Sequence, residues 1–274
     1  MKVGSGSYYR YLKGATYRES PQKAERRARV KACFTENSRR SGSRRIAAAL
    51  SIGRSTVRGV MKREGLRAIG AKSFKPQTTD SKHNLGISDN LLKNPSNEPA
   101  GAGEVLIGDI TYLPLSNGKF CYLACLQDKF TRRIVGWKVA ERMTAQLVID
   151  VFNQARKRWR LKRDAIIHTD RGSQYASVEY RRLLYINSFR QSMSGKGNCY
   201  DNAQAESFFS RLKAELLEKG VFESVGQARS EVFSYIEGYY NRVRLHSSLG
   251  YKSPQEFEKQ LAINNQKRSK ESFV

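Results

Sequence analysis

The chain has 274 residues, of which 50 are Lys or Arg and 25 are Asp or Glu, so its formal net charge is +25. A surplus of this size predicts a polyanionic partner, such as a nucleic acid, and says nothing about the fold. No run reaches the roughly 18 apolar residues that a membrane span needs, and the first residues lack the apolar segment of a secretory signal. We therefore expect a cytoplasmic protein.

The cysteines point to the same compartment. They are spaced too irregularly for a disulfide framework and lack the spacing of a zinc knuckle. We expect all four to be reduced thiols: Cys33, Cys121, Cys125 and Cys199.

The first 70 residues form a basic arm that is prone to helix formation. Residues 1–75 hold 20 Lys or Arg and 4 Glu, a net charge of +16. Segment 43–66 has two short apolar faces on either side of a turn, which is the outline of a helix-turn-helix. We expect its second helix to present Arg54, Thr56 and Arg58 to DNA, although a hairpin of this size can also serve packing alone. The apolar positions are Ile46, Ala47, Leu50, Val57, Val60 and Met61.

Composition divides the rest of the chain into three parts. Residues 71–103 are rich in Ser, Asn, Pro and Gly and are predicted to be a linker. Residues 104–259 have the pattern of a compact α/β domain, and residues 260–274 are a short polar tail.

Hydrophobic periodicity gives the elements of the α/β domain in order. Three strand-like runs precede a helix, a fourth strand and two more helices, with a glycine-containing loop before the last helix. Their expected ranges are 105–115, 120–130 and 132–142 for the strands, 144–159 for the helix, 165–170 for the fourth strand, 178–189 for the next helix, 194–198 for the loop and 202–218 for the last helix.

Three acidic residues stand out in this order. Asp109 interrupts the most apolar strand, where a carboxylate is costly unless something compensates it. Asp170 ends the fourth strand, and Glu206 lies on the last helix, with 60 and 35 residues between successive members. Carboxylates on two strands and a helix can converge, and hard oxygen ligands select Mg²⁺ or Mn²⁺. The alternative is that each one is a helix cap or a solvated charge.

The segment from Leu106 to Pro254 resembles the catalytic core of retroviral integrases and, more closely, transposases of the bacterial "IS three" family. The matching stretches are GDITYLPL (108–115), HTDRGSQY (168–175), SMSGKGNCYDNAQAESFFSRLKAEL (192–216) and YYNRVRLHSSLGYKSP (239–254).

The resemblance implies a ribonuclease-H-like fold in the α/β class, with a mixed five-stranded sheet and flanking helices, preceded by the helical arm. It also implies a DNA transposase with Asp109, Asp170 and Glu206 as catalytic metal ligands. Two Mg²⁺ ions, which Mn²⁺ can replace, would assist cleavage of the element's ends and strand transfer.

The same resemblance implies the partners. These are double-stranded DNA, in the form of terminal inverted repeats and target DNA, and further copies of the chain in a dimer or higher oligomer. A further implied partner is the product of an upstream first reading frame, to which the chain would be fused or with which it would act. Such a protein would be associated with the nucleoid of a bacterium.

Further residues are candidates for DNA contacts. Lys213 lies two helical turns after Glu206 on the same face, and Asn202 lies one turn before it. Lys196 lies in the glycine-containing loop, and His168 shares a face of its strand with Asp170, as a packed core residue or as a support for the site.

Two other functions remain open at this point. A metal-dependent nuclease of the ribonuclease H type would use the same acidic residues but would yield only hydrolysis products. A non-catalytic DNA-binding regulator derived from a transposase would show no metal-dependent nicking. Chemistry alone gives no role for His246, which lies in the last matching stretch.

Overall fold

The computed structural model describes residues 5–14, 19–70, 85–159, 161–195, 203–217 and 220–271. The chain divides into two compact units, Met1–Ile69 and Gly70–Val274. No helix in the described ranges is long and apolar enough to cross a membrane.

The first unit is built from helices, α1 (Ser5–Leu12), α2 (Pro21–Glu36), α3 (Ser43–Leu50) and α4 (Arg54–Arg63). Ser20 caps α2 by accepting a hydrogen bond from the Lys23 N–H, and α3 ends at Ser51, whose φ is +53°. Helices α2, α3 and α4 share one apolar core, made of Val30, Cys33, Phe34, Ile46 and Val57. The predicted apolar faces of α3 and α4 therefore pack against each other and against α2.

The second unit contains a five-stranded sheet in the order β3-β2-β1-β4-β5. Strands β1 (Val105–Pro114), β2 (Phe120–Asp128) and β3 (Ile134–Ala140) are antiparallel neighbours. Strands β4 (Ile166–Thr169) and β5 (Arg190–Met193) run parallel to β1. The sheet is therefore mixed, as the resemblance implies.

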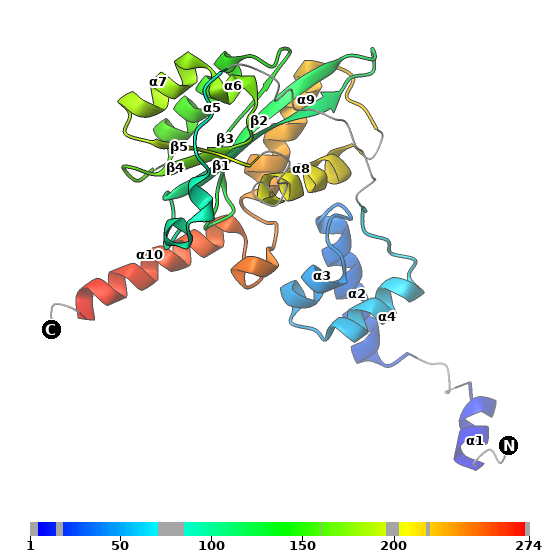
Figure 1. The fold of residues 1–274 in the computed structure, drawn as a ribbon. Coiled ribbons are helices and arrows are strands. Elements are labelled where there is room, and N and C mark those ends of the chain that lie inside the picture. Colours follow the sequence, from blue (N-terminus) through cyan, green and yellow to red (C-terminus); the bar gives the residue numbers. More distant parts are fainter. Residues whose placement is uncertain are drawn as a thin grey trace. The chain divides into compact units, whose positions relative to one another are not determined.

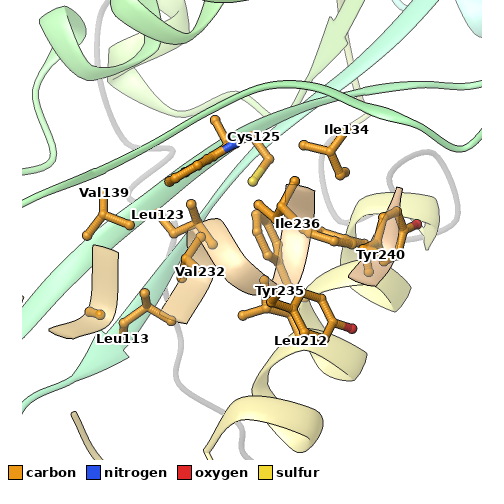
Figure 2. Close-up of a cluster of buried hydrophobic side chains, with 14 of the residues drawn as sticks. Leu113, Leu123, Cys125, Ile134, Val139, Leu212, Val232, Tyr235, Ile236 and Tyr240 are labelled. Carbon is orange, nitrogen blue, oxygen red and sulfur yellow. The ribbon is translucent and has the colours of Figure 1, made fainter. Parts of the chain in front are cut away.

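Helices cover both faces of this sheet (Figure 1). One face packs against α5 (Ala145–Arg158), α6 (Ser173–Ala176) and α7 (Val178–Ile186). The other packs against α8 (Ala203–Leu216), α9 (Val225–Phe233) and the π-helix η4 (Ser234–Tyr240). Figure 2 shows the apolar core on this second face, where Leu123 and Cys125 of β2 meet Val232, Tyr235 and Ile236.

The fifth strand corrects one predicted element. The helix expected over 178–189 ends at Ile186, and β5 begins four residues later. Ser188 has a φ of +59°, which turns the chain out of the helix, and Phe189 packs against the sheet instead. Apolar periodicity could not reveal β5, because its four residues are Arg-Gln-Ser-Met.

The segments on either side of the sheet also have regular structure. Two 3₁₀ turns, η1 (Leu91–Lys93) and η2 (Pro95–Asn97), lie within the segment predicted as a linker, and Leu91 and Leu92 pack against β1 and β4. After η5 (Ser247–Leu249), helix α10 (Pro254–Glu271) runs through most of the residues predicted as a polar tail.

Candidate catalytic site

The register of β1 and β4 places two carboxylates side by side. Ile107 pairs with His168 in the parallel ladder, and Asp109 and Asp170 each follow two residues later. Because side chains alternate along a strand, both aspartates continue the same face of neighbouring strands. Gly108 and Thr169 match this register, since a Cβ on Gly108 would lie 3.0 Å from Cγ2 of Thr169.

The Asp109 carboxyl is buried and interacts with the charges of Asp170 and Glu206. Burial raises the pKa of the Asp109 carboxyl well above its usual value, and the charges of Asp170 and Glu206 raise it further. The Ile110 N–H, which donates to Oδ1 of Asp109 at 2.8 Å, and the Lys213 ammonium both act in the opposite direction. A concentration of negative charge of this kind favours a bound cation.

Asp170 is held by the loop that follows it. The Gly172 N–H donates to Oδ1 of Asp170 at 3.0 Å. A Cβ on Gly172 would lie 3.1 Å from that same oxygen, so a larger residue would crowd the carboxylate.

Helix α8 brings the third acid to the same face of the sheet. Ala205 belongs to a buried cluster with Val105, Ile107 and Ile166, so the first turn of α8 lies over the face that carries Asp109. Glu206 is the next residue and is exposed. Lys213, farther along α8, is partly buried; burial lowers the pKa of its ammonium and the charge of Asp109 raises it.

The chemistry of these donors fits a hard divalent cation, because all are carboxylate oxygens and Asp109 and Asp170 are neighbours. Within the described part of the chain, no group of three or more His, Cys, Asp or Glu is gathered closely enough to hold an ion. Two predicted DNA-contact residues, Lys196 and Asn202, lie in 196–202, outside the described residues.

His168 is buried in the sheet, with no exposed surface. Its Nδ1 lies 2.8 Å from Oγ of Ser192, which in turn accepts a hydrogen bond from the Leu91 N–H at 2.9 Å. The histidine therefore joins β4 to β5 and η1.

The predicted contacts on the arm lie on one helix. Arg54, Thr56 and Arg58 of α4 are exposed, whereas Val57 is fully buried in the core of the first unit. Helix α4 thus keeps its polar first turns at the surface.

Sequence reasoning missed two side chains next to Asp109. Cys125 is its register partner on β2, and burial together with the Asp109 charge raises the pKa of the Cys125 thiol well above its usual value. Burial and, after it, the Asp109 charge also raise the pKa of the buried Tyr175 hydroxyl well above its usual value. Tyr175 lies in the stretch HTDRGSQY, so the motif contained the signal, but only the fold shows that this ring approaches Asp109.

Comparisons with known proteins identify the family. Two family models described as "Integrase core domain" match residues 99–199 and 187–254. The transposase InsF for insertion sequence IS3A of Escherichia coli (strain K12) is 41% identical over 234 residues, which cover 84% of this chain and 80% of that protein. The transposase for insertion sequence element IS904 of Lactococcus lactis is 41% identical over 250 residues, covering 88% of this chain and 98% of that protein.

Among solved structures, the HTLV-2 integrase catalytic core domain in complex with magnesium is similar. The identity is 15% and the TM-score 0.43, with 57% of this chain and 95% of that chain covered. The sequence relatives carry the assignment, because they match at high identity over most of both chains. The chain therefore belongs to the IS3 family of insertion-sequence transposases, enzymes of the DDE type that carry an integrase core domain.

Proposed function

We propose that Asp109, Asp170 and Glu206 hold two divalent metal ions, Mg²⁺ or in its place Mn²⁺, and form the catalytic triad of this transposase. The observation that carries the proposal is the parallel register of β1 and β4, which makes Asp109 and Asp170 neighbours under the first turn of α8. When bound, such ions would activate an attacking oxygen and stabilise the leaving oxygen of a phosphoryl transfer.

The reaction proposed is cleavage at the element's ends followed by strand transfer. In the first step a water oxygen forms a bond to phosphorus, the bond to the 3′ oxygen breaks, and that oxygen takes up a proton. In the second step the oxygen of the new 3′ hydroxyl forms a bond to phosphorus in target DNA and loses its proton, while the target's bond from that phosphorus to its own 3′ oxygen breaks and the released oxygen takes up a proton. No covalent bond between protein and DNA is needed.

The chain's own groups orient the acids and the DNA. The backbone N–H groups of Ile110 and Gly172 each fix one carboxylate oxygen, so Asp109 and Asp170 are held before any ligand arrives. Lys213 supplies a positive charge next to Asp109 and would contact the backbone of the DNA end. Lys196 and Asn202 are proposed as further contacts.

DNA recognition is proposed for the first unit, through the exposed Arg54, Thr56 and Arg58 of α4. Its partners would be the terminal inverted repeats, with target DNA engaged at the second unit, Gly70–Val274, which we call the catalytic unit. We also propose that the chain acts as a dimer or higher oligomer on DNA, alone or with the product of an upstream reading frame, and that it resides at the nucleoid.

The test is a cleavage and strand-transfer assay on a duplex that carries the element's terminal repeat, with Mg²⁺ or Mn²⁺. We expect Asp109→Asn, Asp170→Asn and Glu206→Gln each to abolish cleavage while DNA affinity stays within about twofold, since each keeps its volume and loses a ligand charge. Cleavage that persists in one variant would remove that residue from the site. Hydrolysis without strand transfer would favour the nuclease, and no metal-dependent nicking would favour the regulator.

A further inference from the structure

A cluster of buried polar side chains lies on the far side of α8 from the acidic site. We call Glu215 of α8, Tyr235 of η4 and Arg244 the Glu215 cluster. The Tyr235 hydroxyl donates to Oε2 of Glu215 at 2.8 Å, and the Arg244 guanidinium lies 3.7 Å from Oε1 of Glu215. Glu215 and Arg244 are each only 6% exposed. The cluster lies beside the apolar core of Figure 2, in which Tyr235 and Leu212 are labelled.

The cluster is anchored to the sheet through the segment after η4. Asn241 accepts from the Ile134 N–H and donates to its carbonyl oxygen, both at 3.0 Å. The Tyr240 hydroxyl accepts a hydrogen bond from Nε2 of Gln127 at 2.7 Å. Gln127 lies on β2, two residues after Cys125. Arg244 lies 5.5 Å from the Tyr240 ring centroid. The partners that hold Glu215 are therefore fixed to β2 and β3.

His246 completes this arrangement. Its ring packs edge-on against Tyr240, with centroids 5.1 Å apart, and its Nε2 lies 3.4 Å from Nη1 of Arg244. The stretch YYNRVRLHSSLG thus supplies the residues that link the sheet to α8. These are Tyr240, Asn241, Arg244 and His246.

The contact between α8 and this face of the sheet is otherwise largely apolar, apart from Nε2 of Gln204, which donates to the Asp128 carbonyl oxygen at 3.4 Å. Phe208, Phe209 and Leu212 pack into the core. Apolar burial is roughly proportional to area and has little directional preference, so it leaves small rotations of a helix inexpensive. A buried ion pair depends on direction, because a movement that leaves either buried charge without its partner costs much free energy. Glu215 is therefore the buried charged contact that can fix the rotation of α8.

Helix geometry links this contact to the site. At about 100° per residue, Glu215 lies about 180° around the helix from Glu206 and about 160° from Lys213. With side chains about 5–6 Å from the helix axis, a rotation of about 20° would move the Glu206 carboxylate by about 2 Å. A misplacement of about 1 Å can cost about 100-fold in rate.

We propose that Glu215, Tyr235 and Arg244 set the rotation of α8 about its own axis and so position Glu206 and Lys213 beside Asp109. They are positioning residues that touch neither DNA nor metal. This inference rests on the proposed function, because it assigns Glu206 and Lys213 their orientation in that site.

The decisive variant is Tyr235→Phe, which removes one hydroxyl and keeps the ring. Its matched control is Tyr180→Phe on α7, since that hydroxyl is also buried and has no hydrogen-bond partner among the described residues. We expect Tyr235→Phe to slow single-turnover cleavage of end DNA at least tenfold at saturating DNA, and Tyr180→Phe to stay within twofold. Glu215→Gln, which is isosteric, serves as a second variant, and combined with Tyr235→Phe it should slow cleavage by less than the product of the single effects.

A second readout separates positioning from stability. Free Mn²⁺ is measured by electron paramagnetic resonance in the presence of protein and end DNA. The Asp109→Asn variant is the reference, because the Mn²⁺ that it still binds lies outside the site. We expect the site's dissociation constant for Mn²⁺ to rise at least threefold in Tyr235→Phe and to stay unchanged in Tyr180→Phe.

The outcomes distinguish the two proposals. A lower melting temperature with unchanged rate and unchanged Mn²⁺ binding would reduce the cluster to a stabilising contact and overturn the inference. Equal behaviour of Tyr235→Phe and Tyr180→Phe would overturn it as well. Equal Mn²⁺ binding by the wild type and Asp109→Asn would instead contradict the proposed site.

Discussion

Glu258 of α10 lies at a contact where burial and an ion pair oppose each other. Its Oε2 is 2.5 Å from Nη1 of Arg133, and its side chain is 15% exposed. Burial raises the pKa of the Glu258 carboxyl from 4.5 to about 7; Asp128 adds to this effect, and Arg133 opposes it. The penalty of burial therefore exceeds the gain from the ion pair.

The change to test is Glu258→Gln, which keeps the shape and removes the charge. Between pH 4.5 and 7 the folded state binds a proton that the unfolded state has released, so stability should fall as the pH rises through this window. The difference between 4.5 and 7 corresponds to about 3 kcal/mol at about 1.4 kcal/mol per pH unit. Because the side chain keeps some contact with water, we expect about 1–2 kcal/mol.

The measurement is urea unfolding of the wild type and Glu258→Gln at pH 5, 6, 7 and 8. The two should have similar stability at pH 5, and the variant should be more stable by about 1–2 kcal/mol at pH 8. The control is Glu141→Gln, which removes the charge of an exposed carboxylate. If the wild type instead gains stability relative to Glu258→Gln as the pH rises, the ion pair with Arg133 outweighs burial and the reasoning is wrong.

Three further expectations concern activity, packing and DNA affinity. Lys213→Ala should slow single-turnover cleavage at least tenfold, and added Mn²⁺ should not restore the rate. Lys213→Arg should retain more activity because the positive charge survives. A wild-type rate in Lys213→Ala would show that Lys213 is only a surface lysine. Gly136→Ala should destabilise the catalytic unit by about 3 kcal/mol or more. The reason is that the new Cβ would lie 2.5 Å from the Val151 carbonyl oxygen of α5. An unchanged melting temperature would contradict this expectation. Replacing Arg54 and Arg58 by Ala should reduce the slope of log K against log salt by up to about 2, and an equal effect of Lys259→Ala on α10 would refute a specific role of α4.

Much of the catalytic unit could be predicted because its signals are local. The runs at 105–115, 120–130 and 132–142 became β1, β2 and β3, and the helical spacing after residue 144 became α5. Strand β5 left no such signal, since its residues are mostly polar and it is held by backbone pairing to β4.

The candidate site was predictable only in part, for a similar reason. Spacing and residue type singled out Asp109 and Asp170, and the register explains why they are neighbours. The Glu215 cluster escaped prediction, because a Glu, a Tyr and an Arg on an amphipathic pattern are normally assigned to the surface. Only tertiary contacts show that Glu215 and Arg244 are buried together.

The parallel pairing of β1 with β4 has a consequence for the order in which the protein folds. Strands β1, β2 and β3 are joined by short turns and can pair as soon as they are synthesised, whereas β4 must wait for α5 and then insert beside β1. Non-local parallel pairing forms slowly, because the entropy of closing the loop is lost before the stabilising contacts form. Domains fold mainly in the order of synthesis, so the separate N-terminal unit is complete first. Nascent chains therefore pass through a stage in which α4 is formed and Asp109 still lacks Asp170 as its neighbour, so the proposed DNA-binding helix forms before the proposed catalytic site.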